Sequence, residues 1–469
     1  MKKKVVSALL CATMVATMFA GCGSKESDNN ASTPDTSKAD TSSEVSEPAE
    51  DTGKVLNIYC WNEEFKSRIT AHYPDYQEVD ATHGKIGDVD VVWNITPNDD
   101  NAYQNNLDAT LLNQADAPAD DKIDLFLVEA DYALKYVDTD YTMPIKDLGI
   151  TDDDLSKQYQ YTKDIVTDSK GVLKGLSWQG CPGVLFYNRD AAKEVLGTDD
   201  PDKVQESVKD WDAYNDTAKK MKDAGYKMTA SANDTYRVYS NNVTSKWVDG
   251  NKINIDDNIM KWVDDSKAQV DAGETGTCDL WSDDWSKGFY PQGKVFCYFG
   301  PAWLVNFSMA ADTEGSIGYN GGWGAAQGPQ GFFWGGTWIC AAQGTDNANL
   351  VKDIMLKMTT DDDIMKDIVV DDDDFVNNST VMNGLADGSI KVKDDKEYTS
   401  KILGGQNPLP MYCAGVETLD LSNLSSYDQG CNEEFQNAMK NYFEGKASKE
   451  DALDLFYKAV TEKYPELTY

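Results

Sequence analysis

Strand-like and helix-like segments alternate along about 415 residues that begin at Val55. The strand-like runs are rich in β-branched and aromatic residues and cover residues 55–60, 89–95, 123–128, 183–187, 295–299 and 336–341. Apolar residues recur at helical spacing in residues 211–221, 350–358, 435–443 and 448–460. This alternation predicts an α/β fold built on parallel sheet. The length exceeds what one hydrophobic core supports, so we expect two or three domains.

The first 54 residues do not share this pattern. Lysines at positions 2–4 precede an uncharged run over residues 5–20. A basic start and a short apolar run before small residues are typical of a secretory signal peptide, here residues 1–21. Phe19-Ala20-Gly21-Cys22 resembles a bacterial lipobox, which implies lipidation of Cys22; the alternative is an ordinary secreted protein cut near Ala20. Residues 22–54 are rich in Ser, Thr, Asp, Glu, Ala and Pro, so we expect them to form a disordered tether.

The charge and the histidine count exclude several classes of function. The formal net charge is −37, which argues against nucleic acid or an anionic membrane surface as a partner and favours a soluble monomer. Only His72 and His83 are available for a zinc site or a Ser-His-Asp triad. The sequence contains no P-loop and no G-x-G-x-x-G or H-E-x-x-H motif. We therefore expect neither histidine-based catalysis nor a cofactor or metal.

Seven cysteines remain after the signal peptide and Cys22 are set aside, namely Cys60, Cys181, Cys278, Cys297, Cys340, Cys413 and Cys431. An odd number cannot pair completely within one chain. Several lie in apolar runs, which favours free, buried thiols, while one or two disulfides are the alternative.

An acidic run at Asp371-Asp372-Asp373-Asp374 could mark a calcium loop or a solvated loop. The spacing of an EF-hand is not followed, which favours the solvated loop.

Tryptophans are concentrated in one part of the chain. Six of the twelve lie between Trp281 and Trp338, in segments rich in glycine. On such loops an indole ring can line a cleft, where its flat face suits the C–H face of a pyranose. The same rings could instead fill a core between lobes, and composition alone does not separate these two interpretations.

Four motifs resemble those of family 1 extracellular solute-binding proteins of carbohydrate ABC transporters, which are related to the maltose-binding proteins. They occur in the family's order at residues 124–132, 141–148, 175–190 and 293–303. The third resembles G-x-P-W followed by L-x-Y-N-K-D, with Ser177 in place of proline. The fourth contains Gly300-Pro301-Ala302-Trp303, which is similar to the family's G-P-W and its ligand-stacking tryptophan.

This resemblance implies a two-lobe periplasmic-binding-protein type II fold with a hinge between the lobes. By analogy, the N-lobe comprises residues 55–143 and 336–382, and the C-lobe residues 144–335 and 383–469. The protein would be tethered outside the cell by lipid and would pass its ligand to permease subunits. The ligand would be a neutral oligosaccharide, with maltooligosaccharides as the first candidate.

The implied site draws on both lobes. The N-lobe would supply Trp61, Asn62, Glu63, Glu64, Glu129 and Asp131. The C-lobe and the crossings would supply Trp178, Gln179, Asp234, Tyr236, Trp303, Trp334 and Trp338. Asp428 is either a further contact or merely the start of a helix.

A competing hypothesis is a surface glycoside hydrolase. Glu63 or Glu64 with Glu129 or Asp131 would supply its two carboxylates. A structural adhesin, which would bind no soluble sugar, is a third possibility.

Overall fold

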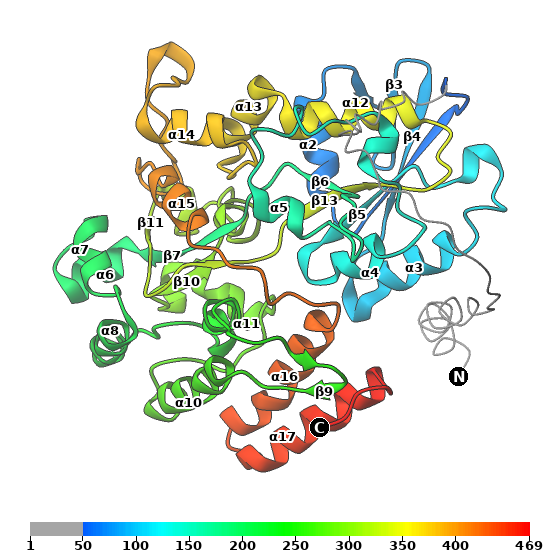
Figure 1. Cartoon of the computed structure of the whole chain (residues 1–469). Helices are drawn as coiled ribbons and strands as arrows, with labels where there is room; N and C mark the ends of the chain where they lie inside the picture. The colour runs from blue at the N-terminus through cyan, green and yellow to red at the C-terminus, as the bar shows by residue number, and fades with distance from the viewer. Residues whose placement is uncertain (1–49) are drawn as a thin grey trace, which may run out of the picture.

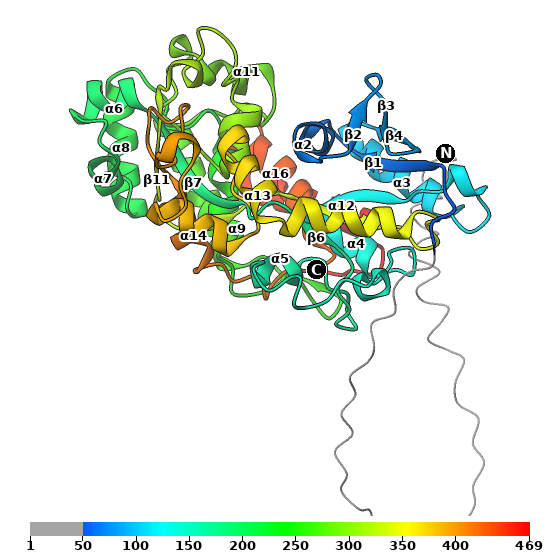
Figure 2. The same cartoon turned by 90° about the horizontal axis from the view of Figure 1, so that it is seen from above.

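The computed structural model describes residues 50–469, and it divides into two lobes (Figures 1 and 2). The signal peptide, Cys22 and nearly all of the expected tether lie outside the described residues.

A sheet of seven strands organises the first lobe, in the order β2-β3-β4-β1-β5-β13-β6. Its strands are β1 (Val55–Cys60), β2 (Tyr76–Glu78), β3 (His83–Ile86), β4 (Val89–Ile95), β5 (Leu125–Glu129), β6 (Leu176–Ser177) and β13 (Thr337–Ala341). Only the pairs β1–β4 and β1–β5 are parallel, and Ile58 is in register with both Trp93 and Leu125. The other pairs are antiparallel, so the expectation of parallel sheet holds only for the centre of this lobe.

Helices cover both faces of this sheet. Figure 1 shows α2 (Glu64–His72), α12 (Ala348–Thr360) and α13 (Asp362–Asp372) on one side and α3 (Ala102–Leu111) and α4 (Ala133–Val137) on the other. The apolar stripe predicted for residues 350–358 is confirmed, because Val351, Ile354, Met355 and Met358 are buried on α12 and Leu350 is half-buried.

The second lobe combines a small sheet with a group of helices. Strand β7 (Pro182–Asn188) pairs antiparallel with β10 (Cys297–Gly300), β11 (Trp323–Ala326) and β12 (Phe332–Phe333). Around this sheet lie α6 (Arg189–Leu196), α7 (Pro201–Glu206), α8 (Trp211–Asp223), α11 (Asp283–Ser286), α14 (Ser379–Asp387) and α15 (Leu409–Val416) (Figure 1). The prediction of a helix from Trp211 is confirmed, with Tyr214, Ala218 and Met221 buried.

A helical part completes the second lobe. It contains α9 (Tyr236–Ser240), α10 (Asp257–Ala272), α16 (Asp428–Phe443), α17 (Lys449–Lys463) and the short hairpin β8 (Val248–Asp249) and β9 (Lys252–Ile253). Ser448 caps α17 as predicted, because its hydroxyl accepts a hydrogen bond from the Asp451 backbone N–H at 3.0 Å. Trp262, Phe435 and Phe456 form the centre of this core.

Two lobe boundaries differ from those expected by analogy. Strand β6 pairs with β13, so the first sheet takes in residues up to Ser177, beyond the crossing expected after residue 143. The short α5 (Gln160–Asp164) lies beside β6. The second boundary, expected at residue 382, falls inside α14.

The seven cysteines of the described residues are all free, and five of them are buried. The free-thiol interpretation is therefore confirmed. Within residues 50–469 no group of three or more His, Cys, Asp or Glu side chains is placed to hold a metal ion.

The acidic run at Asp371–Asp374 is not the solvated loop that we expected. Asp371 and Asp372 end α13, and the Asp374 side chain is buried. Asp372 forms ion pairs with Arg68 at 2.8 Å and with His72 at 2.9 Å. These partners lie on α2, which is distant in sequence, so the pairing could not be read from the acidic run itself.

Candidate functional site

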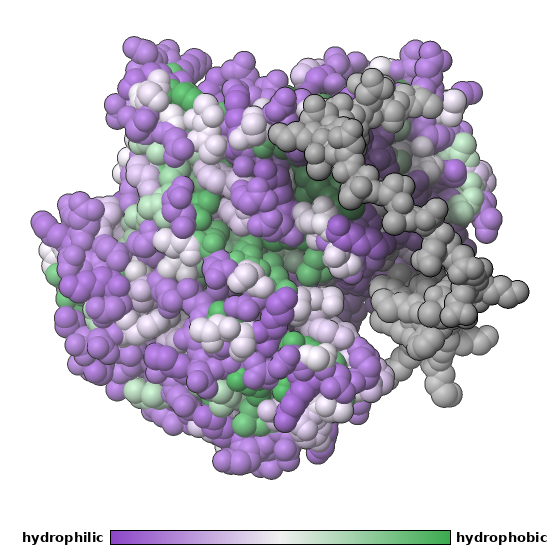
Figure 3. Space-filling view, viewed as in Figure 1, coloured by the Kyte–Doolittle hydropathy of each residue, from purple (hydrophilic) through white to green (hydrophobic). Residues whose placement is uncertain are grey.

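A cleft of about 540 Å³ lies between the two lobes. Its walls come from the loop after β1, the end of β5, helix α9, a short helical segment at residues 303–308, and loops around residues 280–281 and 334–337. Loops at strand ends on opposite lobes thus meet around one space, as is common for ligand sites in α/β folds. On the face shown in Figure 3, polar residues dominate the outer surface and apolar residues gather near the middle.

The loop after β1 supplies Trp61 and Asn62 to the cleft, and the first residue of α2 supplies Glu64. The Asn62 carboxamide oxygen accepts a hydrogen bond from the Glu64 backbone N–H at 3.0 Å, which orders the start of α2. Trp61 packs on the rings of Tyr103 and Tyr132, at centroid distances of 5.7 and 6.2 Å. Its indole is therefore fixed in place, although it remains partly exposed to the cleft.

A buried polar network lies under this wall. The Gln179 side-chain amide donates to Glu64 Oε1 at 2.8 Å and to Asp374 Oδ2 at 3.0 Å. Its carbonyl oxygen accepts from the Thr337 backbone N–H at 3.1 Å. Burial, followed by repulsion from Asp374, raises the pKa of Glu64 to about 7. Gln179 thus joins α2 to the start of β13 at the floor of the cleft.

Glu129 ends β5, Asp131 follows it, and both face the second lobe. Both carboxyl oxygens of Asp131 accept from the guanidinium of Arg237 on α9, with Nη1 to Oδ1 at 2.8 Å and Nη2 bonded to Oδ2. Glu129 Oε2 accepts from the Asp131 backbone N–H at 3.0 Å. Burial and the charge of Asp131 raise the pKa of Glu129 well above its usual value. A bidentate ion pair therefore bridges the lobes beside a carboxyl group that resists ionisation.

Three tryptophans form the facing wall on the second lobe. The ring centroids of Trp303 and Trp334 are 5.4 Å apart, and Trp281 lies 6.2 Å from the first and 5.7 Å from the second. The indole N–H of Trp303 donates to the Trp334 backbone oxygen at 3.3 Å. Gly335 and Gly336 follow with φ of 68° and 98°, a backbone that glycine adopts without strain.

Eight of the predicted site residues line this cleft: Trp61, Asn62, Glu64, Glu129, Asp131, Gln179, Trp303 and Trp334. Glu63 is exposed beside it and does not form part of the wall.

The prediction was wrong in placing Trp178 and Trp338 on the wall, because both side chains are fully buried. Trp178 stacks on Phe65 at 5.3 Å. Trp338 lies on β13, which has a neighbouring strand on each side, and its indole N–H donates to the Thr162 backbone oxygen at 2.7 Å. These rings belong to the core.

Asp234 and Tyr236 are also corrections, because both are buried and neither lines the cleft. Asp234 accepts from the Trp285 indole N–H at 2.8 Å and from the Ser231 backbone N–H at 2.8 Å. The Tyr236 hydroxyl donates to Asn432 at 2.5 Å. Both side chains therefore hold the second lobe together.

Sequence reasoning missed ten residues of the wall: Asn233, Arg237, Leu280, Trp281, Phe307, Ser308, Gly335, Gly336, Thr337 and Gln436. Arg237 follows the predicted Tyr236 directly, but helix geometry turns the two side chains in different directions. Trp281 belongs to the tryptophan cluster seen in the sequence, and this cluster could have indicated that Trp281 lines the cleft.

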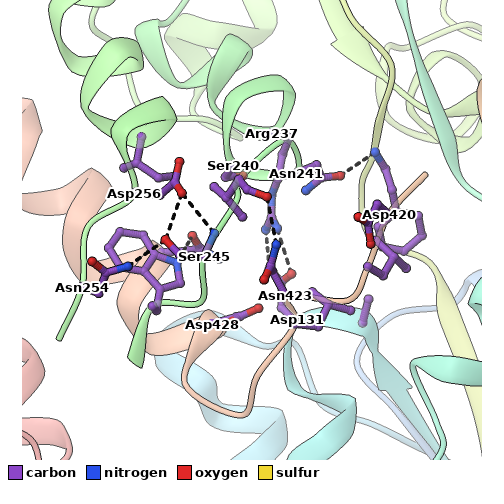
Figure 4. A pocket seen from close by; sticks show the side chains of 18 residues that line it. Asp131, Arg237, Ser240, Asn241, Ser245, Asn254, Asp256, Asp420, Asn423 and Asp428 are labelled. Carbon is purple, nitrogen blue, oxygen red and sulfur yellow. Dashed lines mark hydrogen bonds and ion pairs between the residues drawn. The ribbon is translucent and has the colours of Figure 1, made fainter. Parts of the chain in front are cut away.

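Asp428 lies at a second, smaller cavity of about 50 Å³ (Figure 4). It begins α16, and its carboxylate accepts from the Ser425 hydroxyl and backbone N–H. Burial raises its pKa to about 7. Asp131 and Arg237 line both cavities, so their ion pair separates the second cavity from the main cleft.

Comparison with known protein families identifies the family of this chain. The family model of bacterial extracellular solute-binding proteins matches residues 80–399, which is more than half of the sequence. The chain belongs to this family. As a solute-binding protein it has a clear candidate for the solute site in the cleft between the lobes. A comparison with curated protein sequences finds no match. None of the helices within residues 50–469 combines the length and apolar character needed to cross a membrane.

Three solved structures of similar fold are described as binding proteins or as bound to a sugar. A family 1 extracellular solute-binding protein is 17% identical and has a TM-score of 0.67, over 87% of this chain and 99% of the other. The ABC-transporter-associated binding protein of B. animalis subsp. lactis, solved with β-1,6-galactobiose, is 19% identical with a TM-score of 0.63, over 89% and 99%. Maltose-bound MalE3 of T. maritima is 13% identical with a TM-score of 0.61, over 87% and 99%. These likenesses confirm the two-lobe fold.

Proposed function

We propose that this solute-binding protein captures a neutral oligosaccharide between its lobes and delivers it to the permease of an ABC importer. The observation that carries the proposal is that an aromatic wall on one lobe faces a polar wall on the other. Trp303 and Trp334 present aromatic faces from one lobe, while Asn62, Glu64 and Glu129 present amide and carboxyl groups from the other. Aromatic faces suit the C–H faces of sugar rings, and carboxyl and amide groups suit their hydroxyls.

The charges of the cleft favour a neutral sugar over an anionic one. Arg237 is the only cationic side chain among the described residues of the wall, and Asp131 already occupies both of its terminal nitrogens. A phosphate or uronate would therefore find no free guanidinium to bind. Sugars of relatives with this fold, β-1,6-galactobiose and maltose, are themselves uncharged.

Ligand capture requires the lobes to close around the sugar. A ligand that contacts both lobes stabilises the closed arrangement by its higher affinity for that arrangement. Bidentate contact between Asp131 and Arg237 would add to closure. Small-angle scattering should show that a saturating sugar makes the protein more compact.

We further propose that Cys22 carries the lipid that holds the protein at the outer face of the membrane, and that the protein acts as a monomer. The basic and apolar leader and the lipobox-like residues before Cys22 support the anchor. The position beside a permease would keep captured sugar close to its point of entry.

Isothermal titration against a panel of neutral sugars tests the proposal. The panel should contain maltooligosaccharides, cello-oligosaccharides, β-1,6-galactobiose and lacto-N-biose. We expect saturable binding of at least one series with one sugar per protein. The absence of heat and of any change in tryptophan fluorescence with every sugar would contradict the proposal.

The same incubations test the glycoside hydrolase hypothesis. We propose that the protein releases its sugar intact, because Asp131 is tied to Arg237 and Glu64 is tied to Gln179. Chromatography of the sugar after long incubation should show no new product. Cleavage products in excess of the protein would favour the hydrolase instead.

A further inference from the structure

The rim of the cleft carries two aromatic side chains that are exposed to solvent. Trp281 is 54% exposed and Phe307 is 51% exposed, whereas Trp334 deeper in the same wall is 9% exposed. Among the described residues, seven large apolar side chains are exposed, and of these only Trp281 and Phe307 line the cleft. Both lie on the second lobe, where they extend the aromatic wall from the interior towards the mouth.

The backbone of Trp281 is strained. Its φ is 68°, in the left-handed region that bulky residues rarely adopt. Such a conformation persists only where the surroundings enforce it, and it is found preferentially at ligand-binding positions. Here the ring packs against Trp285 at 5.0 Å and against Trp334 at 5.7 Å, and one side remains open to the cleft.

Neither ring behaves as a core residue. A core tryptophan of this protein, such as Trp285, is 1% exposed. An exposed indole costs the free protein solvation free energy, which a ligand covering the ring would recover. A ligand on Trp281 would also reach the inner cleft. The Trp281 ring lies 6.2 Å from the Trp303 ring and is nearly parallel to it, at 28°.

We propose that Trp281 and Phe307 form an outer sugar-binding platform that makes this protein prefer longer oligosaccharides. This inference rests on the proposed function. A short sugar occupies the inner cleft between Trp61 and Trp303, whereas additional units extend through the mouth onto the platform. The two exposed rings therefore determine which chain length binds best.

The test compares chain lengths within the linear series that the panel identifies, beginning with maltose, maltotriose, maltotetraose and maltohexaose. For the wild type we expect affinity to rise with length. For Trp281→Ala and Phe307→Ala we expect a loss of affinity that grows with chain length, about 3- to 10-fold larger for the longest sugar than for the shortest sugar that binds. Titration calorimetry at one temperature and salt concentration measures both.

Three further variants make the result specific. Tyr319→Ala removes an exposed aromatic ring of the same lobe that does not line the cleft, so it should change neither affinity. Trp303→Ala removes an inner ring and should weaken short and long sugars alike. Trp281→Gly removes the same ring as Trp281→Ala but adopts positive φ freely, so it should be at least as stable as the alanine variant.

The outcomes distinguish a failure of the outer platform from a failure of the proposed function. Equal losses for short and long sugars in Trp281→Ala would mean that the ring acts only in lobe closure, and this would overturn the platform. Unchanged affinity for every length would overturn it as well. If no sugar series binds the wild type, the proposed function itself fails.

Discussion

At the scale of single residues, identical residue types have different roles in this protein. Trp338 and Trp303 both lie in glycine-rich motif segments, and the sequence suggested a cleft position for each. Trp338 is fully buried on β13, which has a neighbouring strand on each side, whereas Trp303 lies in a short helical segment after β10 and lines the cleft. The sequence could thus predict that tryptophans gather at the cleft, but not which rings face it, because that depends on pairing between distant strands.

Alanine substitutions should separate these roles by stability. Trp338→Ala removes a fully buried ring and its hydrogen bond to Thr162, and should lower the free energy of unfolding by about 3–5 kcal/mol. Trp303→Ala removes a partly exposed ring and should cost about 1 kcal/mol. Urea denaturation followed by circular dichroism measures both. Equal costs would show that the two positions are not core and cleft.

The raised pKa of Glu64 has a consequence for stability. The unfolded chain releases this proton near its ordinary pKa of 4.5, while the folded protein retains it up to about 7. Between these values the folded state binds more protons, so stability falls as pH rises, and the fall is complete above about pH 7. This loss of folding stability amounts to at most about 3 kcal/mol.

Glu64→Gln should therefore make the pH dependence of stability between about pH 4.5 and pH 7 less steep, since the amide does not ionise. The exposed neighbour offers a matched control, because Glu63→Gln makes the same change of charge outside the buried network. Denaturation midpoints across this pH range give the comparison. A curve for Glu64→Gln that parallels both the wild type and Glu63→Gln would contradict the assignment.

At the scale of elements, local sequence predicted the strands and helices with strong patterns. Strands β1 and β4 and helices α8, α12 and α17 appear where β-branched runs or helical spacing placed them. Short elements such as β6 and the β8–β9 hairpin carry too few residues to show a pattern. Strand direction also escaped prediction, because β13 reaches the first sheet by crossing from the second lobe and pairs antiparallel.

The loop between Trp334 and β13 should tolerate little change. A Cβ on Gly336 would lie 2.9 Å from Cys181 Sγ and 3.1 Å from the Trp338 ring, and its φ of 98° already disfavours alanine. Gly336→Ala should lose about 2–4 kcal/mol of stability from backbone strain and crowding together, and should weaken sugar binding.

Gly171→Ala is the control for the backbone term alone. Gly171 has φ of 78°, and a Cβ there meets no atom within 4 Å. The Gly171→Ala variant should lose about 1–2 kcal/mol of stability and should bind sugar as the wild type does. If both variants lose the same stability and both keep wild-type sugar affinity, the crowded loop does not position the cleft.

At the scale of the whole molecule, the resemblance of motifs predicted the two lobes and eight residues of the cleft wall. It did not predict how the lobes touch. The Asp131–Arg237 ion pair joins residues 106 positions apart, and the Asn306 side-chain amide donates to the Asp372 backbone oxygen from the other lobe. Such contacts depend on the packing of complete lobes, which no local pattern records.

The anchor is a prediction at this scale too. Cys22→Ala removes the site of lipidation that the sequence indicates and leaves residues 50–469 unchanged. We expect the variant in the soluble fraction with wild-type sugar affinity, since acyl chains at this position would be the source of firm membrane attachment. Fractionation of cells after a salt wash measures it. Retention of the variant in membranes would contradict lipidation at Cys22.

The central claim is that the cleft between the lobes holds one neutral oligosaccharide against its tryptophan wall. Calorimetric titration of the wild type and of folded Trp303→Ala with the tightest sugar of the panel tests this claim most directly. The account predicts one binding site in the wild type and a loss of about 30- to 1,000-fold in the variant, the cost of removing a stacking ring from a desolvated site. Equal affinity of the two proteins would show that the sugar binds elsewhere and would contradict the account.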